Sequence, residues 1–404
     1  MKTLIQPNKY CIRTLGKQTR EDGIQYRLSR FVISEGDLMY NALTGEVLED
    51  AGEDSQIARW FRVPENMDET VLAYSIRQKW LQNARGPGGN VKNRYILFLT
   101  TVCNAHCGYC YENGTRSMTM TEQTAADVAE YILSHSDHNG DVRIRWFGGE
   151  PLVNIKAIDV ISGRLNADGF KYSSEMFSNG DLLHMVTDEQ IRAWHLLEVQ
   201  FTIDDVGAEY DRIKGLPAGA FDRICNSIDR MAALGIRVHI RIHYHPGKGT
   251  EAPLRVAKQF CGMRGVSPYC VMLYADAGEE DYDGLLTVQK YIHSHGGQRI
   301  GLPDLRFRMS CMADNRRVAC ITTDGHLSPC EHHPYGENYG SIYGKGYDQA
   351  VLKRWAAKGR NYCKGCVLYP SCGRAALCPV EGKCTEAEIN YKVQRIRFVL
   401  REAK

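Results

Sequence analysis

The chain has 404 residues, of which 43% are hydrophobic and 24% charged, and its formal net charge is only +2. This is the composition of a globular protein with more than one small core, and it gives no argument for binding nucleic acid or an anionic membrane. No apolar stretch reaches the roughly 18 residues of a membrane span, and the N-terminus lacks the apolar core of a signal peptide. We therefore expect a cytoplasmic protein without nucleic-acid or membrane partners.

Residues 1–90 predict a small α+β domain that ends in a linker. Residues 25–33 and 37–48 are typical of strands interrupted by turn residues, whereas 54–62 and 68–82 are typical of helices. Residues 85–90, Arg-Gly-Pro-Gly-Gly-Asn, have the composition of a linker.

Residues 91–300 show a different hydrophobicity pattern, in which short apolar runs alternate with amphipathic stretches. The strand candidates are 95–99, 142–147, 174–177, 199–203, 238–244 and 269–274. The helix candidates are 122–134, 155–165, 188–197, 221–234 and 252–260. This alternation predicts an α/β fold with parallel strands and right-handed crossovers, as an open or closed barrel. In such barrels the chemistry lies on loops at the C-terminal ends of the strands.

Residues 301–404 predict a third domain that is rich in Cys, Gly and Pro and closes with a helix over 385–403. A core in this segment would be weak without metal. The chain has fifteen cysteines, of which three lie in 103–110 and eight in 311–384. Since reducing compartments disfavour disulfides, such clustering indicates metal sites.

Cys103, Cys107 and Cys110 lie directly after the first barrel strand, where a catalytic loop is expected. Their x3, x2 spacing allows three thiolates to converge on one metal centre and leaves one iron of a cubane cluster without a protein ligand. A zinc site is the alternative, but structural zinc normally takes four protein ligands.

This cysteine run, with Tyr109 before its last member, resembles the radical S-adenosylmethionine (radical SAM) superfamily. The resemblance implies a partial (β/α)6 TIM-like barrel in which Cys103, Cys107 and Cys110 hold a [4Fe–4S] cluster. S-adenosylmethionine (SAM) would chelate the open iron and be cleaved to a 5′-deoxyadenosyl radical. The backbone of Tyr109 would contact the adenine, and an electron donor such as flavodoxin or ferredoxin would reduce the cluster.

Further positions at strand ends match SAM-contacting positions of the family. These are Gly148, Gly149, Glu150, Pro151, Ser178, Asn179 and Arg241. The resemblance implies that residues 148–151 receive the methionine amino group and that Ser178 and Asn179 contact the ribose. Arg241 is a candidate for binding the SAM carboxylate, or else an arginine on the outside of the barrel. Residues 202–205, Thr-Ile-Asp-Asp, end the fourth strand where relatives often carry Ser-x-Asp-Gly.

The C-terminal cysteines resemble the SPASM extension of peptide-maturing radical SAM enzymes, which holds two auxiliary [4Fe–4S] clusters and would raise the total to three. By position, one auxiliary cluster would be held by Cys363, Cys366, Cys372 and Cys384. The other would be held by Cys311, Cys320, Cys330 and Cys378. The chain departs from the family pattern with x5 between Cys372 and Cys378. Two zinc sites are the alternative, because four thiolates suit zinc as well as iron.

Glu331 follows Cys330 at a place where anaerobic sulfatase maturases carry a catalytic Asp. It is therefore a candidate catalytic base, or else a solvated loop residue.

Residues 38–47 resemble the winged-helix-like leader-binding domains of peptide-modifying radical SAM enzymes, to which a leader peptide can add as a strand. The alternative is a structural cap on the barrel. Together the resemblances imply an oxidoreductase that matures a ribosomally made precursor peptide (RiPP) with a leader, by forming a thioether or another crosslink. Formylglycine formation and a non-catalytic zinc-rich binding protein remain the alternatives.

Overall fold

A computed structural model describes residues 18–19, 23–49, 61–84, 92–136, 138, 141–273, 281–303, 317–332, 337–352, 366–369, 372 and 384–403. The chain forms two compact units. The barrel unit comprises residues 89–299 and 316–353, and the terminal unit comprises residues 1–88, 300–315 and 354–404. The residues after 300 are thus divided between the two units.

An eight-stranded sheet, in the order β12-β11-β10-β9-β8-β7-β13-β14, forms the centre of the barrel unit. Its first six members in chain order are β7 (Arg94–Phe98), β8 (Arg143–Phe147), β9 (Ser173–Ser178), β10 (Leu196–Ile203), β11 (Arg237–Tyr244) and β12 (Val266–Met272). Each is parallel to the next, which confirms the predicted α/β architecture. β13 (Val318–Ile321) adds in parallel to β7, and β14 (Leu327–Ser328) adds antiparallel to β13.

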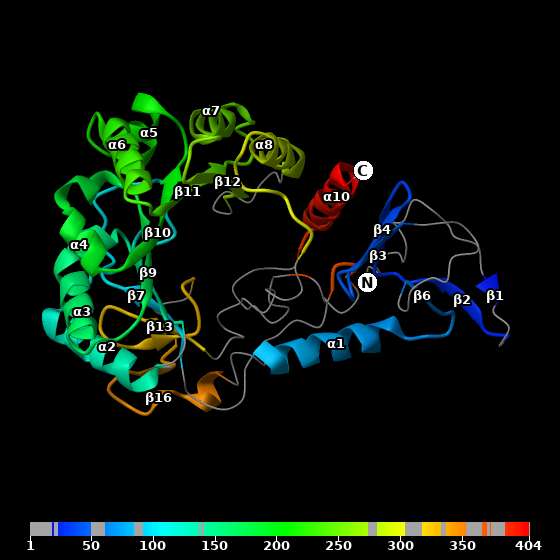
Figure 1. The fold of residues 1–404 in the computed structure, drawn as a ribbon, viewed down its shortest axis with the longest axis horizontal. Coiled ribbons are helices and arrows are strands. Elements are labelled where there is room, and N and C mark those ends of the chain that lie inside the picture. The colour runs from blue at the N-terminus through cyan, green and yellow to red at the C-terminus, as the bar shows by residue number, and fades with distance from the viewer. Residues whose placement is uncertain are drawn as a thin grey trace. The chain divides into compact units, whose positions relative to one another are not determined.

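Helices follow the barrel strands and cover the outer side of the curved sheet (Figure 1). They are α2 (Glu122–His135), α3 (Ile155–Ala167), α4 (Asp188–Ala193), α5 (Gly207–Lys214), α6 (Ala220–Ala233), α7 (Glu251–Phe260) and α8 (Tyr282–Ser294). Short helices η1 (Pro151–Asn154) and η2 (Asp181–Met185) and a β15–β16 hairpin (Gly340–Ser341, Gly346–Tyr347) complete the described part of the unit. α4 begins at a capping box between Thr187 and Gln190 and ends four residues earlier than predicted.

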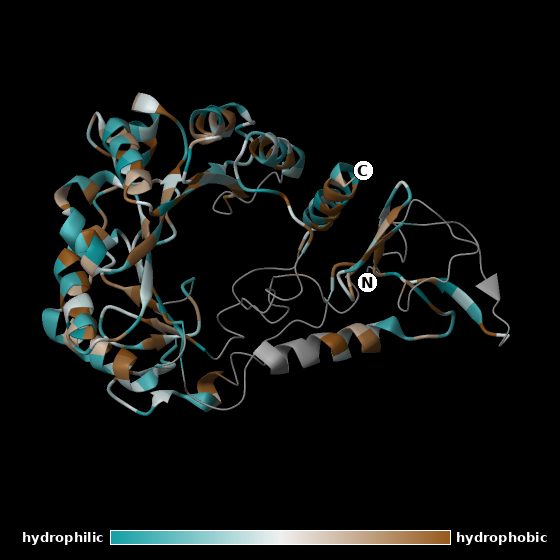
Figure 2. Ribbon diagram, in the orientation of Figure 1, coloured by the Kyte–Doolittle hydropathy of each residue, from teal (hydrophilic) through white to brown (hydrophobic). Residues whose placement is uncertain are grey.

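Side chains alternate between two faces along each barrel strand. On β10, Val199, Phe201 and Ile203 are fully buried. The alternate positions carry polar side chains, of which Glu198 and Thr202 are half-buried and Gln200 is buried. Apolar segments accordingly line the strands and one side of the surrounding helices (Figure 2). The opposite, concave face of the sheet therefore carries polar and charged side chains.

The terminal unit contains two three-stranded sheets, β1-β2-β6 and β3-β4-β5. The strands are β1 (Gln18–Thr19), β2 (Gln25–Leu28), β3 (Val32–Glu35), β4 (Leu38–Asn41), β5 (Val47–Glu49) and β6 (Arg62–Pro64). Two helices accompany them, α1 (Glu69–Ala84) and α10 (Glu386–Glu402). The helix predicted over 54–62 falls largely outside the described residues, and its last position begins β6.

One hydrophobic core joins the beginning and the end of the chain. Phe31, directly before β3, and Tyr40 of β4 are fully buried against Val393, Ile396 and Leu400 of α10. α10 contacts both β3 and β4. The N-terminal strands and the C-terminal helix therefore stabilise each other. Within the parts of the chain that the structure describes, no helix is long and apolar enough to cross a bilayer.

Candidate functional site

The loop of Cys103, Cys107 and Cys110 leaves the C-terminal end of β7 and is held by the loop that leaves β8. The backbone N–H of Gly149 donates to Thr100 O over 2.8 Å, and that of Glu150 donates to Val102 O over 3.0 Å. A Cβ on Gly148 would overlap the Thr100 carbonyl oxygen, and one on Gly149 would lie 2.6 Å from Val102 O. The two glycines are therefore needed for this backbone-to-backbone approach.

Glu150 is a fully buried carboxylate that links β8 to β9. It accepts hydrogen bonds from the Ser178 hydroxyl at 2.9 Å, the Asn179 N–H at 2.7 Å and the Leu152 N–H at 3.1 Å. Burial raises its pKa to about 7, although these hydrogen bonds oppose the rise. Glu150 thus organises the strand ends in addition to the ligand-binding role expected from its motif.

Asn179 contacts the first cysteine of the loop. Its side-chain amide donates to Asn104 Oδ1 at 2.7 Å and lies 3.7 Å from the Cys103 sulfur. Asn104 in turn donates to Asp181 Oδ2 at 3.0 Å. The segment predicted to contact the ribose therefore also positions the start of the cysteine loop.

Lys214, at the end of α5, holds the middle of the same loop. Its carbonyl accepts from the His106 N–H at 2.7 Å, and its ammonium donates to the Tyr109 hydroxyl at 2.6 Å. The ammonium also lies 2.7 Å from Asp204 Oδ2, and both side chains are almost fully buried. One lysine thus contacts the loop through both its backbone and its side chain.

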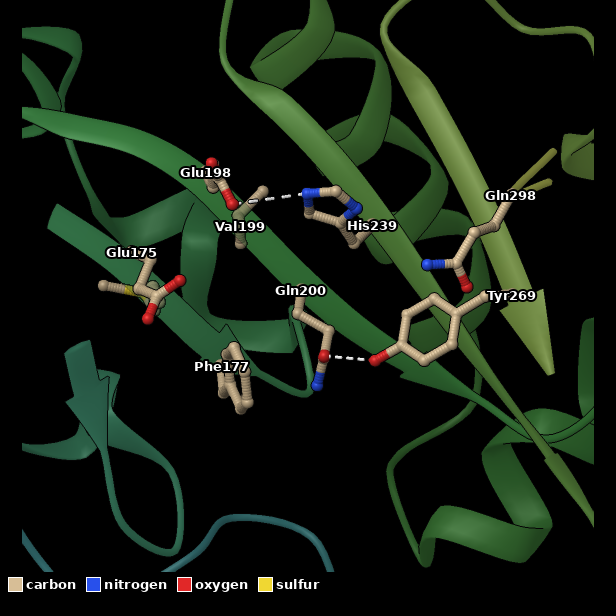
Figure 3. A pocket seen from close by; sticks show the side chains of 9 residues that line it. Glu175, Phe177, Glu198, Val199, Gln200, His239, Tyr269 and Gln298 are labelled. Atoms are coloured by element: carbon tan, nitrogen blue, oxygen red, sulfur yellow. Dashed lines mark hydrogen bonds and ion pairs between the residues drawn. The ribbon is translucent and has the colours of Figure 1, made fainter. Parts of the chain in front are cut away.

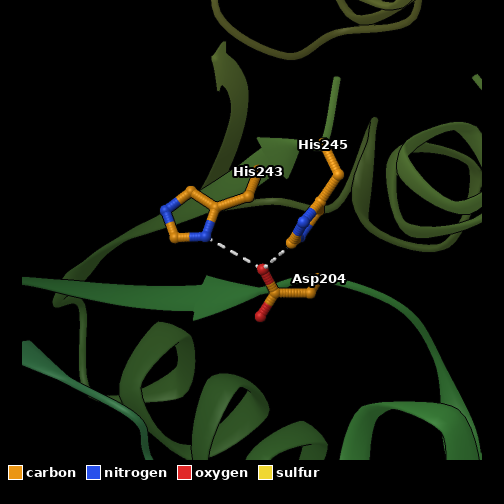
Figure 4. A group of neighbouring side chains, drawn as sticks. All are labelled: Asp204, His243 and His245. Carbon is orange, nitrogen blue, oxygen red and sulfur yellow. Dashed lines mark hydrogen bonds and ion pairs between the residues drawn. The ribbon is translucent and has the colours of Figure 1, made fainter. Parts of the chain in front are cut away.

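Asp204 collects four side chains at the ends of β10 and β11. Oδ2 accepts from the Tyr109 hydroxyl at 2.7 Å and faces the Lys214 ammonium. Oδ1 lies 2.9 Å from His243 Nδ1 and 3.4 Å from His245 Nε2, as Figure 4 shows. Burial alone would raise the pKa of Asp204, but the Lys214 ammonium and the two imidazoles hold it well below its usual range.

Asp204, His243 and His245 also have the residue types of a metal site, with ligand atoms within 4.8 Å of one another. Both imidazole nitrogens are directed at the same carboxylate oxygen, and the other oxygen already faces an ammonium group. The Lys214 ammonium beside this carboxylate would repel a divalent cation. The geometry is that of a hydrogen-bonded ion pair.

The three loop thiols are half-buried and form no disulfide. Burial raises the pKa of Cys103 to about 11 and also raises that of Cys110. Metal binding would have to displace the thiol protons. Three soft donors on one short loop fit an iron–sulfur cluster with three protein ligands.

Residues 97–260 match the sequence model of a family described as "Radical SAM superfamily". Over this stretch, which runs from β7 to the end of α7, the chain is similar to the radical SAM superfamily.

Individual relatives match only in part. TigE of Paramaledivibacter caminithermalis, named a radical SAM cyclopropyl synthase, is 25% identical over 147 residues, which cover 32% of this chain and 31% of that protein. The chain thus matches about a third of that relative's length.

Solved structures share the fold over a longer stretch. SuiB of Streptococcus suis bound to S-adenosylmethionine aligns over 91% of this chain and 95% of its own, with a TM-score of 0.53 and 13% identity. The structure titled native anSMEcpe with bound AdoMet aligns over 77% of this chain and 96% of its own, with a TM-score of 0.52 and 14% identity.

Arg241 lies on the concave face of the barrel sheet. It pairs in register with Thr202 of β10 and Tyr269 of β12. Its Nε is buried and has no hydrogen-bond partner within the described segments. This placement favours a role toward an anionic ligand over that of an exterior arginine.

The concave face also brings Cys320, Cys330 and Glu331 together. Cys320 is buried on β13, in register with Ile96 of β7. Burial and the nearby Glu331 carboxylate and Cys330 thiol raise its pKa well above the usual range. Glu331 Oε2 accepts from Arg145 Nη1 over 2.7 Å. Glu331 is therefore paired inside the barrel, which argues against a solvated loop residue.

A cavity of about 320 Å³ lies farther down the same face, toward the N-terminal ends of the strands. Glu198 and His239 form one wall, 3.4 Å apart, and Tyr269 donates its hydroxyl proton to Gln200 on another (Figure 3). Gln298 faces the same space. The barrel therefore contains a cavity that polar and apolar side chains line together.

Three of the predicted auxiliary ligands lie together in the terminal unit. Cys366, Cys372 and Cys384 pack against its hydrophobic core. Lys392 of α10 lies 3.7 Å from the Cys384 sulfur. Burial would lower the pKa of Lys392, but the Cys372 thiol, Glu388 and Cys384 raise it. Cys311, Cys363 and Cys378 lie outside the described residues.

Sequence reasoning missed Arg145, Lys214, His243 and His245. Arg145 and His243 occupy alternate, concave positions of barrel strands, so strand periodicity offered a weak signal. Lys214 ends a helix that was not predicted, and its partners come from loops far apart in the sequence.

Proposed function

We propose that this radical SAM enzyme oxidatively modifies a ribosomally made precursor peptide and carries SPASM-type auxiliary clusters. One observation carries the proposal. The cysteine loop, Glu150 and Arg241 are gathered on the sheet face that also holds Cys320, Cys330 and Glu331. The proposed SAM-cleaving end and a second group of thiols would then share one barrel interior.

At the SAM end, Cys103, Cys107 and Cys110 would hold the cluster. When bound, the cluster and SAM supply a reductively generated 5′-deoxyadenosyl radical. Glu150 would accept from the methionine ammonium group, and Arg241 would donate to its carboxylate. Ser178 and Asn179 would face the ribose. The unpartnered Arg241 Nε and the ionisable carboxylate of Glu150 support this arrangement.

Two thiol groups support auxiliary clusters. Cys320 and Cys330 would belong to one cluster, and Cys366, Cys372 and Cys384 to the other. The first pair lies beside Glu331 in the barrel unit. In the second group, Cys372 and Cys384 lie beside Lys392, and Cys366 packs against the hydrophobic core of the terminal unit. Cysteine thiolates in groups of four are the usual ligands of such clusters.

A peptide is the proposed substrate class for three reasons. The barrel interior contains a cavity of about 320 Å³, large enough for side chains of a substrate. SuiB bound to precursor peptide SuiA aligns over 91% of this chain, with a TM-score of 0.52 and 12% identity. In the terminal unit, β5 is an edge strand with an exposed pattern, to which a leader could add as a further strand.

Formylglycine formation on a protein substrate is the second candidate. It is favoured by the position of Glu331, a carboxylate directly after Cys330 that faces the barrel interior. It would act on a serine or cysteine hydrogen and would form no crosslink.

The test is coexpression with short, cysteine-containing open reading frames encoded beside the gene, followed by mass spectrometry. A crosslinked product should weigh less than the peptide by about two hydrogen atoms per bond. The Cys107→Ala variant is the control and should leave the peptide unchanged. An unmodified peptide with the active enzyme, alongside conversion of a sulfatase-derived peptide, would contradict crosslinking and support formylglycine formation.

A further inference from the structure

A buried ion pair attaches the cysteine loop, which follows β7, to the end of α5 and to the residue after β10. Lys214 is 4% exposed and Asp204 is fully buried, and their charged atoms lie 2.7 Å apart. The Tyr109 hydroxyl contacts both, at 2.6 Å from the ammonium and 2.7 Å from the carboxylate. Tyr109 stands between Cys107 and Cys110 in the chain. Two of the three loop thiols thus flank a residue that is fixed by charge-assisted hydrogen bonds.

The surroundings of the Tyr109 ring also restrict its position. His243 and His245 pack against it edge-on, with ring centroids 5.3 Å and 5.5 Å away. Each also hydrogen-bonds to Asp204. The ion pair therefore fixes the Tyr109 hydroxyl. The two imidazoles, which the Asp204 carboxylate orients, restrict the Tyr109 ring.

We propose that Asp204 and Lys214 are positioning residues that set the shape of the Cys107–Cys110 turn before any cluster is bound. Breaking the pair would leave a buried charge uncompensated, so the arrangement has little freedom to shift. A preformed turn presents thiols at a fixed spacing and reduces the ordering cost of ligand binding. The inference rests on the proposed function only in assigning the cluster to this loop.

Asp205 provides a matched control for Asp204. It is the next residue, is also buried, and also forms an ion pair, with Arg255 at 2.7 Å. Arg255 is half-exposed, and neither residue contacts the cysteine loop in any described hydrogen bond. Asp205→Asn therefore removes a comparable charge without touching Tyr109.

The first measurement is hydrogen exchange of the loop amides in the full chain, prepared without iron under reducing conditions. Asp204→Asn and Tyr109→Phe should each accelerate exchange of residues 103–113 about tenfold or more, since each factor of ten corresponds to the ~1.4 kcal/mol typical of a charged hydrogen bond. Asp205→Asn should match the wild type. Tyr109→Phe keeps the ion pair and decides the question if Asp204→Asn fails to fold. Unchanged exchange in Tyr109→Phe would overturn the inference.

The second measurement is the midpoint potential of the SAM-binding cluster after anaerobic reconstitution. Asp204→Asn leaves the Lys214 ammonium without its counter-charge, so the potential should rise. Tyr109→Phe and Asp205→Asn should leave it unchanged, because neither alters charge beside the loop. An unchanged potential in Asp204→Asn would contradict the placement of the pair beside the cluster. A wild-type chain that assembles no cluster on this loop would instead contradict the proposed function, whatever the exchange data show.

Discussion

Glu331 lies 2.7 Å from Arg145, as an ion pair on the concave face of the barrel. Both side chains are largely buried, at 15% and 12% exposure. Arg145 also donates to Glu175 at 2.8 Å, and its guanidinium stacks on Phe177 at 4.1 Å. Burial alone would lower the pKa of Arg145, but the two carboxylates raise it. Glu331 therefore has a structural partner as well as access to the barrel interior.

Glu331→Gln should distinguish a catalytic role of Glu331 from its structural role in the ion pair with Arg145. If Glu331 is the base of peptide modification, the variant should form product roughly 10²–10⁴-fold more slowly. Release of 5′-deoxyadenosine should continue, because the residue does not contact the cysteine loop in any described hydrogen bond. The measurement is the ratio of modified peptide to 5′-deoxyadenosine.

Glu175→Gln is the matched control, because Glu175 binds the same guanidinium from the other side. It should lower stability but leave that ratio near the wild-type value. Equal loss of product in both variants would assign Glu331 a purely structural role.

Cys320→Ala should lower the iron content of the reconstituted protein by up to about four atoms per chain. Cys320 lies beside Cys330 and Glu331, where a proposed auxiliary cluster would be held. Cys270→Ala is the control, since Cys270 is equally buried on β12 but pairs with Ile242 in the sheet, away from those groups. Equal iron in the two variants would remove Cys320 from the ligand set.

Glu150 should make the apoprotein less stable as pH rises. Its carboxyl has a pKa of about 7 in the folded chain, against an ordinary value of 4.5. Between these values the folded state binds the proton more tightly than the unfolded state, so the free energy of unfolding falls as pH increases. The contribution is fully present below pH 4.5 and is lost by about pH 7, and it amounts to about 3 kcal/mol at most.

Chemical unfolding of the apoprotein at pH 5 and pH 7.5 measures this effect. Glu150→Gln should flatten the decline relative to the wild type. Glu130→Gln, at an exposed ion pair on α2, should preserve it. A wild-type slope in Glu150→Gln would show that another group titrates in this range.

Ile396→Ala should loosen the N-terminal strands as well as α10. Ile396 is 2% exposed in the core that joins α10 to Phe31 and Tyr40. Truncation of a buried isoleucine costs about 2–5 kcal/mol. Hydrogen exchange in β3 and β4 should accelerate, whereas Val71→Ala, at a position on α1 that is 61% exposed, should change it little. Unaffected strands would contradict the shared core.

The barrel was largely predictable because its strands are short apolar runs separated by amphipathic helices. The first strand, predicted over 95–99, is Arg94–Phe98, and the third, predicted over 174–177, is Ser173–Ser178. Helices α5 and α8 were missed, and α4 ends at Ala193 because β10 must begin at Leu196. The parallel addition of β13 to β7 depends on pairing across more than 200 residues, which local periodicity does not encode.

The residues of the candidate site were predictable where they form a contiguous motif. Contacts between residues far apart in the sequence were not predictable. The cysteine loop and residues 148–151 follow strands, as expected of a barrel. The contacts of Asp204 with Lys214 and His243 join α5, β10 and β11, and the pairing of Glu331 with Arg145 spans 186 positions. No local pattern specifies such partners, because only the folded sheet brings these distant residues together.

The most direct test is anaerobic reconstitution of the full chain, with iron and zinc analysis and an assay of 5′-deoxyadenosine release from SAM and a reductant. We predict a brown protein with about twelve irons per chain. We expect no release by Cys107→Ala and undiminished release by Cys270→Ala. A colourless, zinc-containing protein that leaves SAM intact would contradict the proposed radical SAM chemistry.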